Sequence, residues 1–257
     1  MSTTPDDQVT APHGPAEVRV ARRVQRRWWV FSALGALGVV LLLGVVVTAR
    51  GGVVGVDERF MAELVENRAA WWDAPALVFD TIGAGVVGVF VVPIAVAVLL
   101  LLHRRRWAAA YWIAASVLSA GTVQLLKHAF GRARPEDILV VSDYGSFPSG
   151  HTANAATMAV VLGVVLRRTW VWLAGLAYTL AMLLSRTYLG AHWLTDTVGG
   201  VLVGVGVAVV LWAPVAHRLL AERGRPWAWQ RAGHGHGHGH GPGQEAGPGP
   251  APDVRRA

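Results

Sequence analysis

Long apolar stretches that contain no Asp, Glu, Lys or Arg constrain this chain more than any other feature. Six stretches have this character: residues 28–49, 81–102, 107–126, 146–166, 169–185 and 197–216. A helix needs about 20 mostly apolar residues to cross a bilayer, whereas a strand of a membrane β-barrel takes about 10 residues of alternating polarity. We therefore expect an all-α integral membrane protein, a bundle of six transmembrane helices, and not a barrel.

The composition excludes two other classes of protein. Hydrophobic residues make up 53% of the 257 positions and charged residues only 15%. Soluble domains carry about 25% charged residues, and disordered chains have low hydrophobicity. Cysteine is absent from the sequence, which rules out disulfides, thiolate metal ligands and a cysteine nucleophile.

The distribution of basic residues predicts the orientation in the membrane. Arg22, Arg23, Arg26 and Arg27 precede the first stretch, which is too long for the apolar region of a signal peptide, so we expect an uncleaved anchor. Basic residues concentrate before the first stretch, between the second and third, between the fourth and fifth, and after the sixth. The positive-inside rule places these segments in the cytoplasm. We expect a multi-pass protein of the cell membrane with both termini cytoplasmic, and the net charge of +7 requires no nucleic-acid partner.

We expect three parts along the chain: residues 1–27 as a cytoplasmic polar tail, residues 28–216 as the six-helix membrane domain, and residues 217–257 as a cytoplasmic tail rich in Gly, Pro and His. In the last part His234, His236, His238 and His240 alternate with glycine. This tract could bind a transition metal loosely or be a solvated low-complexity tail. Apolar residues in the segment 57–73 roughly follow a helical period, which fits a short amphipathic helix at the outer membrane surface or a packed loop.

Polar residues gather next to the apolar stretches in three places. These are Lys127 with Arg134-Pro135, Pro148-Ser149-Gly150-His151, and Ser185-Arg186 through His192 to Asp196. Ionisable groups at a membrane span are costly and therefore indicate function. By the orientation above, all three groups lie at the outer face, so we expect them to form one site.

The cations and the start of the fourth stretch indicate a phosphate ligand. Arginine presents a planar fork that suits phosphate oxygens, and lysine presents a point charge. These are the roles expected for Lys127, Arg134 and Arg186. Ser149 and Gly150 stand where a helix starts, and the free backbone N–H groups there favour an anion. Glycine also lets the backbone approach the ligand closely.

Two histidines complete the expected site. His192 and Asp196 are four residues apart and would share one face of a helix, so the carboxylate can bind one imidazole nitrogen and leave the other free to attack phosphorus. His151 can give a proton to the leaving oxygen. The scheme is in-line displacement through a phosphohistidine, with the cations in the role that Mg²⁺ fills elsewhere, so neither metal nor cofactor is expected. We interpret the lone arginines Arg50 and Arg132 as interfacial anchors.

The three groups resemble the three-part signature of the type 2 phosphatidic acid phosphatases, the integral-membrane lipid phosphate phosphatases related to vanadium haloperoxidases. The matching pattern is Lys127-x6-Arg134-Pro135, then Pro148-Ser149-Gly150-His151, then Ser185-Arg186-x5-His192-x3-Asp196. The resemblance implies a six-helix membrane bundle with a metal-independent site near the outer surface. It also implies roles by position: His192 as nucleophile, Asp196 orienting it, His151 as general acid, and Lys127, Arg134, Ser149, Gly150 and Arg186 on the phosphate.

The resemblance also limits the substrate. Bacterial members of this kind act on undecaprenyl diphosphate, phosphatidic acid, phosphatidylglycerol phosphate or diacylglycerol diphosphate, and a site at the outer face favours undecaprenyl diphosphate. The loop acids Glu136, Asp137 and Asp143 would mildly disfavour a highly anionic head group. A lipid phosphotransferase would use the same site. A transporter is the alternative from a different class, but polar residues in the middle of the stretches are few and uncharged.

Overall fold

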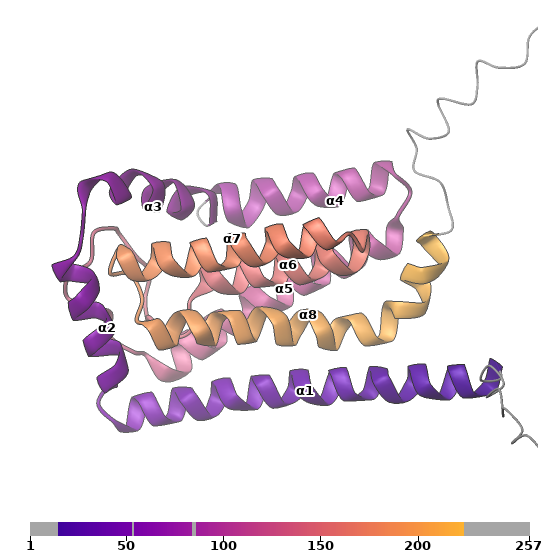
Figure 1. Ribbon diagram of the computed structural model, residues 1–257, viewed down its shortest axis with the longest axis horizontal. Helices are drawn as coiled ribbons and strands as arrows, with labels where there is room; N and C mark the ends of the chain where they lie inside the picture. The colour runs from indigo at the N-terminus through magenta and orange to yellow at the C-terminus, as the bar shows by residue number, and fades with distance from the viewer. Residues whose placement is uncertain (1–14, 53, 84–85, 224–257) are drawn as a thin grey trace, which may run out of the picture.

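The computed structural model describes residues 15–52, 54–83 and 86–223, and the regular secondary structure of this part of the chain is all helix, without a strand (Figure 1). In chain order the helices are α1 (Pro15–Ala49), α2 (Gly55–Glu66), α3 (Ala70–Gly83), the π-helix η1 (Val87–Val91), α4 (Val92–Leu102), α5 (Arg106–Phe130), α6 (Gly150–Leu166), α7 (Thr169–Tyr188) and α8 (Leu194–Arg223). The expected all-α fold is confirmed. Residues 1–14 and 224–257, with the histidine-rich tract, lie outside the described part.

Within the described residues, each of the six apolar stretches lies mainly on helix. By length and composition, the segments Arg27–Ala49, Arg106–Phe130 and Leu194–Arg223 can each cross a membrane, and α3 with η1 and α4 is a fourth span if the bent pair is counted as one. The protein is therefore a multi-pass membrane protein, and the count of six spans stays a prediction. α1 begins at Pro15 and α8 ends at Arg223, beyond the expected boundaries at 27 and 217, because basic residues and leucine continue a helix readily.

The second stretch is a broken helix. α3 and the segment Val87–Leu102 meet at a bend of 44°, and the π-helix η1 follows the bend. A break frees backbone carbonyl groups that must find donors inside a membrane. Asn154 of α6 supplies one: its Nδ2 donates to the carbonyls of Gly83 (3.4 Å) and Gly88 (3.1 Å). The break is thus held by a specific side chain of the neighbouring helix.

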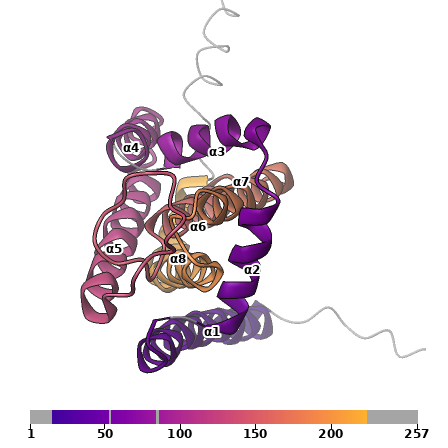
Figure 2. The same ribbon diagram turned by 90° about the vertical axis from the view of Figure 1, so that its left-hand side faces the viewer.

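The segment after α1 contains a helix, as the first of its two interpretations expects, and the position of that helix at the outer membrane surface stays a prediction. α2 crosses the end of the bundle at which α1 ends and α3 begins (Figure 2). It buries Asp57 and Met61, whereas Trp71 and Trp72 at the start of α3 are exposed. A buried carboxylate on this short helix requires a partner, and its partner belongs to the site described below.

The bundle has a small core and a large apolar exterior. α6 lies against α5, α7 and α8 (Figure 2), and the core between α4, α5, α6 and α8 contains Tyr111, Trp112, Val161 and Ala208. Large apolar side chains cover the outward faces, among them Leu42, Leu102, Val117 and Leu173, each more than 60% exposed. Such a surface is unfavourable in water but matches the hydrocarbon of a bilayer.

Glycines allow α6 and α8 to approach closely. A Cβ on Gly200 would clash with Thr152 Oγ1 and the Ser149 carbonyl, and one on Gly204 with the Ala153 carbonyl. Small residues four apart are the usual means by which membrane helices bring their backbones together. The close contact fixes the start of α6 against the start of α8, which are the two helix ends that carry predicted site residues.

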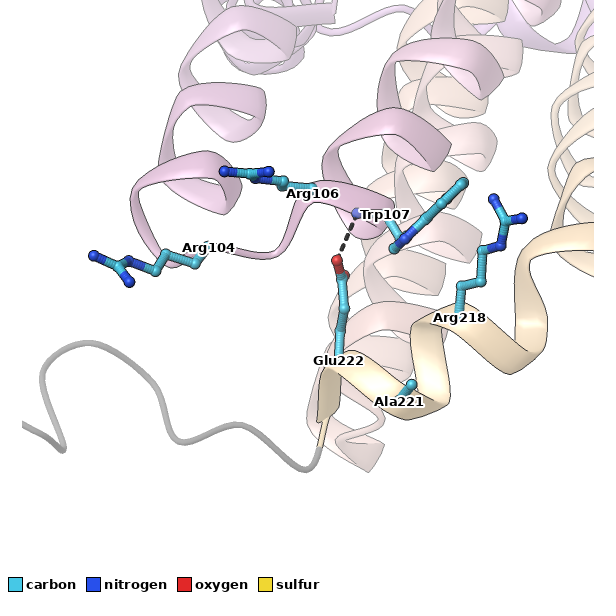
Figure 3. Close-up of a pocket in the computed structure, with 6 residues that line it drawn as sticks. All are labelled: Arg104, Arg106, Trp107, Arg218, Ala221 and Glu222. Atoms are coloured by element: carbon cyan, nitrogen blue, oxygen red, sulfur yellow. Dashed lines mark hydrogen bonds between the residues drawn. The ribbon is translucent and has the colours of Figure 1, made fainter.

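The other end of the bundle is closed by the last turns of α8. The Glu222 carboxylate accepts hydrogen bonds from the backbone N–H groups of Trp107 (2.7 Å) and Ala108 (3.2 Å) at the start of α5 (Figure 3). The Arg218 guanidinium lies 3.8 Å from the centre of the Trp107 ring, a cation–π contact. A cavity of about 480 Å³ beside these residues contains none of the predicted site residues.

Candidate active site

The alternation of helix directions brings the three sequence groups to one end of the bundle. The predicted residues are placed as follows: Lys127 in the last turn of α5, Arg134 in the loop after it, Ser149, Gly150 and His151 at the start of α6, Arg186 in the last turn of α7, His192 in the next loop, and Asp196 in the first turn of α8. Helices α5 and α7 end where α6 and α8 begin (Figure 1). The expectation of a single site therefore agrees with the structure.

Six of these residues line one cavity of about 910 Å³: Lys127, Arg134, Gly150, His151, Arg186 and His192. The rest of the cavity is an apolar groove between α4 and α5, with Phe90, Ile94, Val98 and Val117 among its lining residues. Because a helix rises 1.5 Å per residue, the groove follows α5 for roughly 20 Å, from Lys127 to Ile113. Ser149 and Asp196 are fully buried behind the cavity.

His192 is oriented by a backbone carbonyl, and here the structure corrects the sequence-based expectation. Its Nδ1 lies 2.8 Å from the Ser146 carbonyl, whereas the nearer Asp196 oxygen is 3.7 Å away. His192 precedes α8, which begins at Leu194, so the helical spacing that predicted a direct hydrogen bond to Asp196 does not apply. A carbonyl accepts, so Nδ1 carries the proton and Nε2 keeps its lone pair. Nε2 lies 3.5 Å from Arg134 Nη1.

The surroundings of His192 keep it uncharged. The residue is 2% exposed. Burial, followed by the charges of Arg134, Arg186 and Lys127, holds the pKa of the His192 imidazole well below its usual value of 6.5. Burial also lowers the pKa of the Arg134 guanidinium, and nearby Asp143 opposes that shift. A neutral imidazole with a free Nε2 beside cations is the form that a nucleophile requires.

Asp196 is paired with an arginine that the sequence interpretation treated as a membrane anchor. Arg132 has a fully buried side chain, and its Nη1 donates to Asp196 Oδ1 (2.5 Å) while its Nη2 donates to Asp57 Oδ2 (2.6 Å). Asp57 in turn accepts from the backbone N–H (2.9 Å) and hydroxyl (2.6 Å) of Thr195. The anchor interpretation of Arg132 was wrong because its partners are distant in sequence. The buried Asp57–Arg132–Asp196 clamp joins α2, the α5–α6 loop and α8.

The start of α6 retains unused donors. Ser149 is the N-cap residue but makes no side-chain cap hydrogen bond, and its buried hydroxyl has no hydrogen-bond partner within residues 15–52, 54–83 and 86–223. The backbone N–H of Ser149 donates to the Asp196 carbonyl (2.9 Å). A helix start with free N–H groups and a positive dipole end, opening beside cations, is suited to a phosphate.

The Asp143 carboxylate forms ion pairs with two of the cations. Lys127 Nζ donates to both oxygens of this carboxylate (2.7 and 2.9 Å), and Arg134 Nη2 donates to Oδ1 (2.7 Å). Burial alone would raise the pKa of the Asp143 carboxyl, but the hydrogen bond and charge of Lys127 and the charge of Arg134 outweigh it and hold the pKa below its usual value. The sequence analysis treated Asp143 as a loop acid that weakens anion binding. In the structure it is a carboxylate bound where a phosphate is expected.

Asp80 contacts the remaining cation and one histidine. Its Oδ1 accepts a hydrogen bond from Arg186 Nη1 and lies 3.3 Å from His151 Nε2. Sequence reasoning missed this residue, although it immediately precedes the second apolar stretch and the criterion that selected the cations would have selected it as well. No group of three or more His, Asp or Glu side chains placed to hold a metal occurs in the described residues.

Comparison with known proteins finds similarity mainly in the second half of the chain. A family model described as the PAP2 superfamily matches residues 106–219. An undecaprenyl-diphosphatase of Sulfolobus acidocaldarius is 28% identical over 116 residues, which cover 42% of this chain and 55% of that protein. Phosphatidylglycerophosphatase B of Bacillus subtilis is 35% identical over 92 residues, 32% of this chain and 45% of that protein. The matches thus span about half of each relative's length.

A solved structure has the same fold. The crystal structure of a transmembrane PAP2-type phosphatidylglycerolphosphate phosphatase from Bacillus subtilis superposes with a TM-score of 0.57 at 22% identity. The superposition covers 71% of this chain and 96% of that one. The fold expected from the three-part signature, an integral-membrane bundle of lipid phosphate phosphatase type, is confirmed by this likeness.

Proposed function

We propose, from the premise that this chain is a member of the PAP2 superfamily through residues 106–219, that it is a membrane lipid phosphatase. One observation carries the proposal: three cations and two imidazoles from separate segments line the head of a cavity whose remainder is an apolar groove. A cationic head selects phosphate, and an apolar groove selects a hydrocarbon chain. The cavity as a whole therefore matches a lipid whose head group carries a phosphate.

In the first half of the reaction His192 is the nucleophile. Its Nε2 forms a bond to phosphorus while the bond from phosphorus to the leaving oxygen breaks, and His151 gives that oxygen a proton. The hydrogen bond between Nδ1 and the Ser146 carbonyl (2.8 Å) supports this assignment, because it fixes the tautomer with a free Nε2. Asp196 acts on His192 indirectly. Its carboxylate accepts a hydrogen bond from the backbone N–H of Trp193 (2.9 Å) and so holds the segment that carries His192.

In the second half water hydrolyses the phosphohistidine. His151, now neutral, takes a proton from the water, whose oxygen attacks phosphorus as the bond to Nε2 of His192 breaks. Lys127, Arg134 and Arg186 stabilise the charge on the equatorial oxygens in both halves. The Ser149 hydroxyl, which has no hydrogen-bond partner in the described residues, and the N–H of Gly150 add donors at the positive end of α6. This is the scheme of displacement without a metal that we expect for the chain.

The hydrolase activity is tested by phosphate release from the purified full-length protein in detergent, with EDTA present. We expect turnover of a lipid phosphate or diphosphate, and losses of about 10²- to 10⁴-fold or more in His151→Ala and His192→Ala. His128→Ala is the matched control, since this exposed imidazole at the end of α5 bonds to the Gln124 carbonyl and lies outside the cavity lining. A strict requirement for Mg²⁺, or full activity of His192→Ala, would refute the mechanism.

A panel of substrates decides the finer assignment. We favour undecaprenyl diphosphate, the substrate for which the Sulfolobus relative is named. The alternatives are phosphatidylglycerol phosphate, for which the Bacillus relative is named, and phosphatidic acid. The expected result is the highest kcat/KM for undecaprenyl diphosphate. Including an acceptor alcohol separates the two reaction types, because a phosphotransferase would place the phosphoryl group on the alcohol and a hydrolase would release it.

We further propose that the site faces outward, with both chain termini in the cytoplasm. The support is the clustering of basic residues at the helix ends opposite the site, including Arg167 and Arg168 between α6 and α7, together with the positive-inside rule. A topology reporter fused after Arg168 should give a cytoplasmic signal. An external signal at that position would show that the orientation is the reverse of the one proposed.

A further inference from the structure

Asp80 makes contacts that the mechanism above does not use. Its Oδ1 accepts a hydrogen bond from Arg186 Nη1 and lies 3.3 Å from His151 Nε2, within ion-pair distance. Asp80 belongs to α3, outside residues 106–219 matched by the family model. The proposed general acid and a proposed phosphate ligand therefore share one carboxylate that comes from a separate part of the chain.

The break between α3 and η1 determines where Asp80 stands. Asn154 donates to the carbonyls of Gly83 and Gly88, which lie on the two sides of the break. Asn154 follows His151 by one helical turn on α6, so both side chains lie on the same face. A Cβ on Gly83 would lie 3.2 Å from His151 Cδ2, so α3 passes directly over the imidazole. The face of α6 that carries His151 thus also holds the segment that carries Asp80.

Asp80, which does not line the cavity, differs from Asp143, the carboxylate that does. Asp143 is on a loop, has a 55% exposed side chain and contacts both Lys127 and Arg134, so a phosphate must displace it. Asp80 is on a helix, 27% exposed, and uses one nitrogen of Arg186. The buried Nε of Arg186 has no hydrogen-bond partner in the described part of the chain. A phosphate can therefore bind Arg186 while Asp80 stays in place.

We propose that Asp80 is a positioning residue that favours the protonated form of the His151 imidazole and directs it at the leaving oxygen; this inference rests on the proposed function. The charged and titratable groups facing His151 are Asp80 from α3, Arg186 from α7 and His192 from the loop before α8. Asp80 is the negative member of this set and favours the imidazolium form. The imidazolium keeps the proton that faces Asp80 and gives the other to the leaving oxygen as the phosphorus–oxygen bond breaks.

The test compares two phosphate monoesters with different leaving groups. The alkoxide leaving group of dioctanoyl phosphatidic acid needs a proton, whereas the phenolate of p-nitrophenyl phosphate leaves without one. The readout is kcat/KM, which reports the steps up to formation of the phosphohistidine. Asp73→Asn is the matched control, because Asp73 is on the same helix and bonds to the Tyr188 hydroxyl (2.6 Å), away from the cavity.

We expect Asp80→Asn to lower kcat/KM for phosphatidic acid at least tenfold and to change that for p-nitrophenyl phosphate less than threefold, with neither pattern in Asp73→Asn. Asp80→Glu should restore part of the loss. In a His151→Ala background Asp80→Asn should cause no further loss, because a residue that acts through another has no effect once that residue is gone. Asn154→Ala, which loosens the placement of Asp80, should give a weaker form of the same pattern.

Two results would overturn the inference. Equal losses with both substrates would mean that Asp80 acts on phosphate binding through Arg186, and an additive loss in the His151→Ala background would separate it from the general acid. If Asp80→Asn does not fold, the same comparison is made with Asp80→Glu and Asn154→Ala, and unchanged discrimination between the leaving groups in both would overturn it. Failure of the wild-type protein to turn over any lipid phosphate or diphosphate of the substrate panel would instead reject the proposed function.

Discussion

Removal of Arg132 should destabilise the protein more than any other single change at the site. The Arg132 side chain is fully buried, and it donates to three further acceptors besides Asp57: Asp196 Oδ1, the Thr195 hydroxyl (2.8 Å) and the Gly52 carbonyl (2.7 Å). In Arg132→Ala the two carboxylates of the clamp stay buried without their cation. Breaking a buried ion pair in this way costs about 3–5 kcal/mol, because the remaining charge is uncompensated.

Smaller changes to the clamp should cost less. Asp57→Asn keeps the shape and one of the two oxygens to which Thr195 donates but removes the charge, so the expected loss is the difference between charged and neutral hydrogen bonds, about 1–2 kcal/mol. The neighbouring Glu58 is exposed, and Glu58→Gln should change stability by less than about 0.5 kcal/mol. The clamp also holds Asp196, whose carbonyl accepts the Ser149 N–H at the start of α6, so kcat should fall together with stability.

The assay is thermal unfolding in detergent, measured with kcat on the same preparations. A chain of this size loses roughly 2–4 °C of unfolding midpoint per kcal/mol, so Arg132→Ala should melt about 6–20 °C below the wild type and Asp57→Asn about 2–8 °C below it. If Arg132→Ala unfolds at the same temperature as the wild type, or if Glu58→Gln lowers the unfolding midpoint as much as Asp57→Asn does, the reasoning from buried charge is wrong.

Three further predictions concern the site and the bundle. Asp143→Asn removes a partly exposed carboxylate from two cations, an interaction worth about 0–1 kcal/mol, so KM and the inhibition constant for inorganic phosphate should both fall by up to about fivefold, with no change in the exposed loop control Asp137→Asn. Because the pKa of His192 lies well below 6.5, the acidic limb of kcat/KM from this group should lie well below pH 6.5. The part of the free energy of unfolding that depends on the neutral imidazole should be fully present above pH 6.5 and decline below it, where the unfolded state binds a proton. An acidic limb of kcat/KM centred at pH 6.5 would contradict the lowered pKa. Gly204→Ala should cost about 1–3 kcal/mol in a melting assay because its Cβ meets the α6 backbone, whereas Gly121→Ala, with open space around it, should not.

Much of the site was predictable because a short pattern in the sequence carries it. Lys127, Arg134, Gly150, His151, Arg186 and His192 were all expected in one site, and all line one cavity. Their selection needed only two local signals, namely ionisable residues at the ends of apolar stretches and the spacing within each group. The orientation of His192 was not predictable in this way, because its hydrogen bond goes to a backbone carbonyl, and a carbonyl is present at every position of a chain.

The sequence by itself determined that the chain folds as helices in a membrane, since its apolar runs are too long and too uniform for barrel strands and span hydrocarbon only as helices. It also predicted that the proposed site residues gather at one end of the bundle, and six of them line one cavity there. Only the tertiary structure decided which carboxylate meets which cation. Asp57 reaches Arg132, Asp80 reaches Arg186 and Asp143 reaches Lys127 through the packing of α2 and α3 and the course of a loop. The sequence does not show which residue a charged side chain pairs with, because an ion pair depends on distance in space and not on separation along the chain.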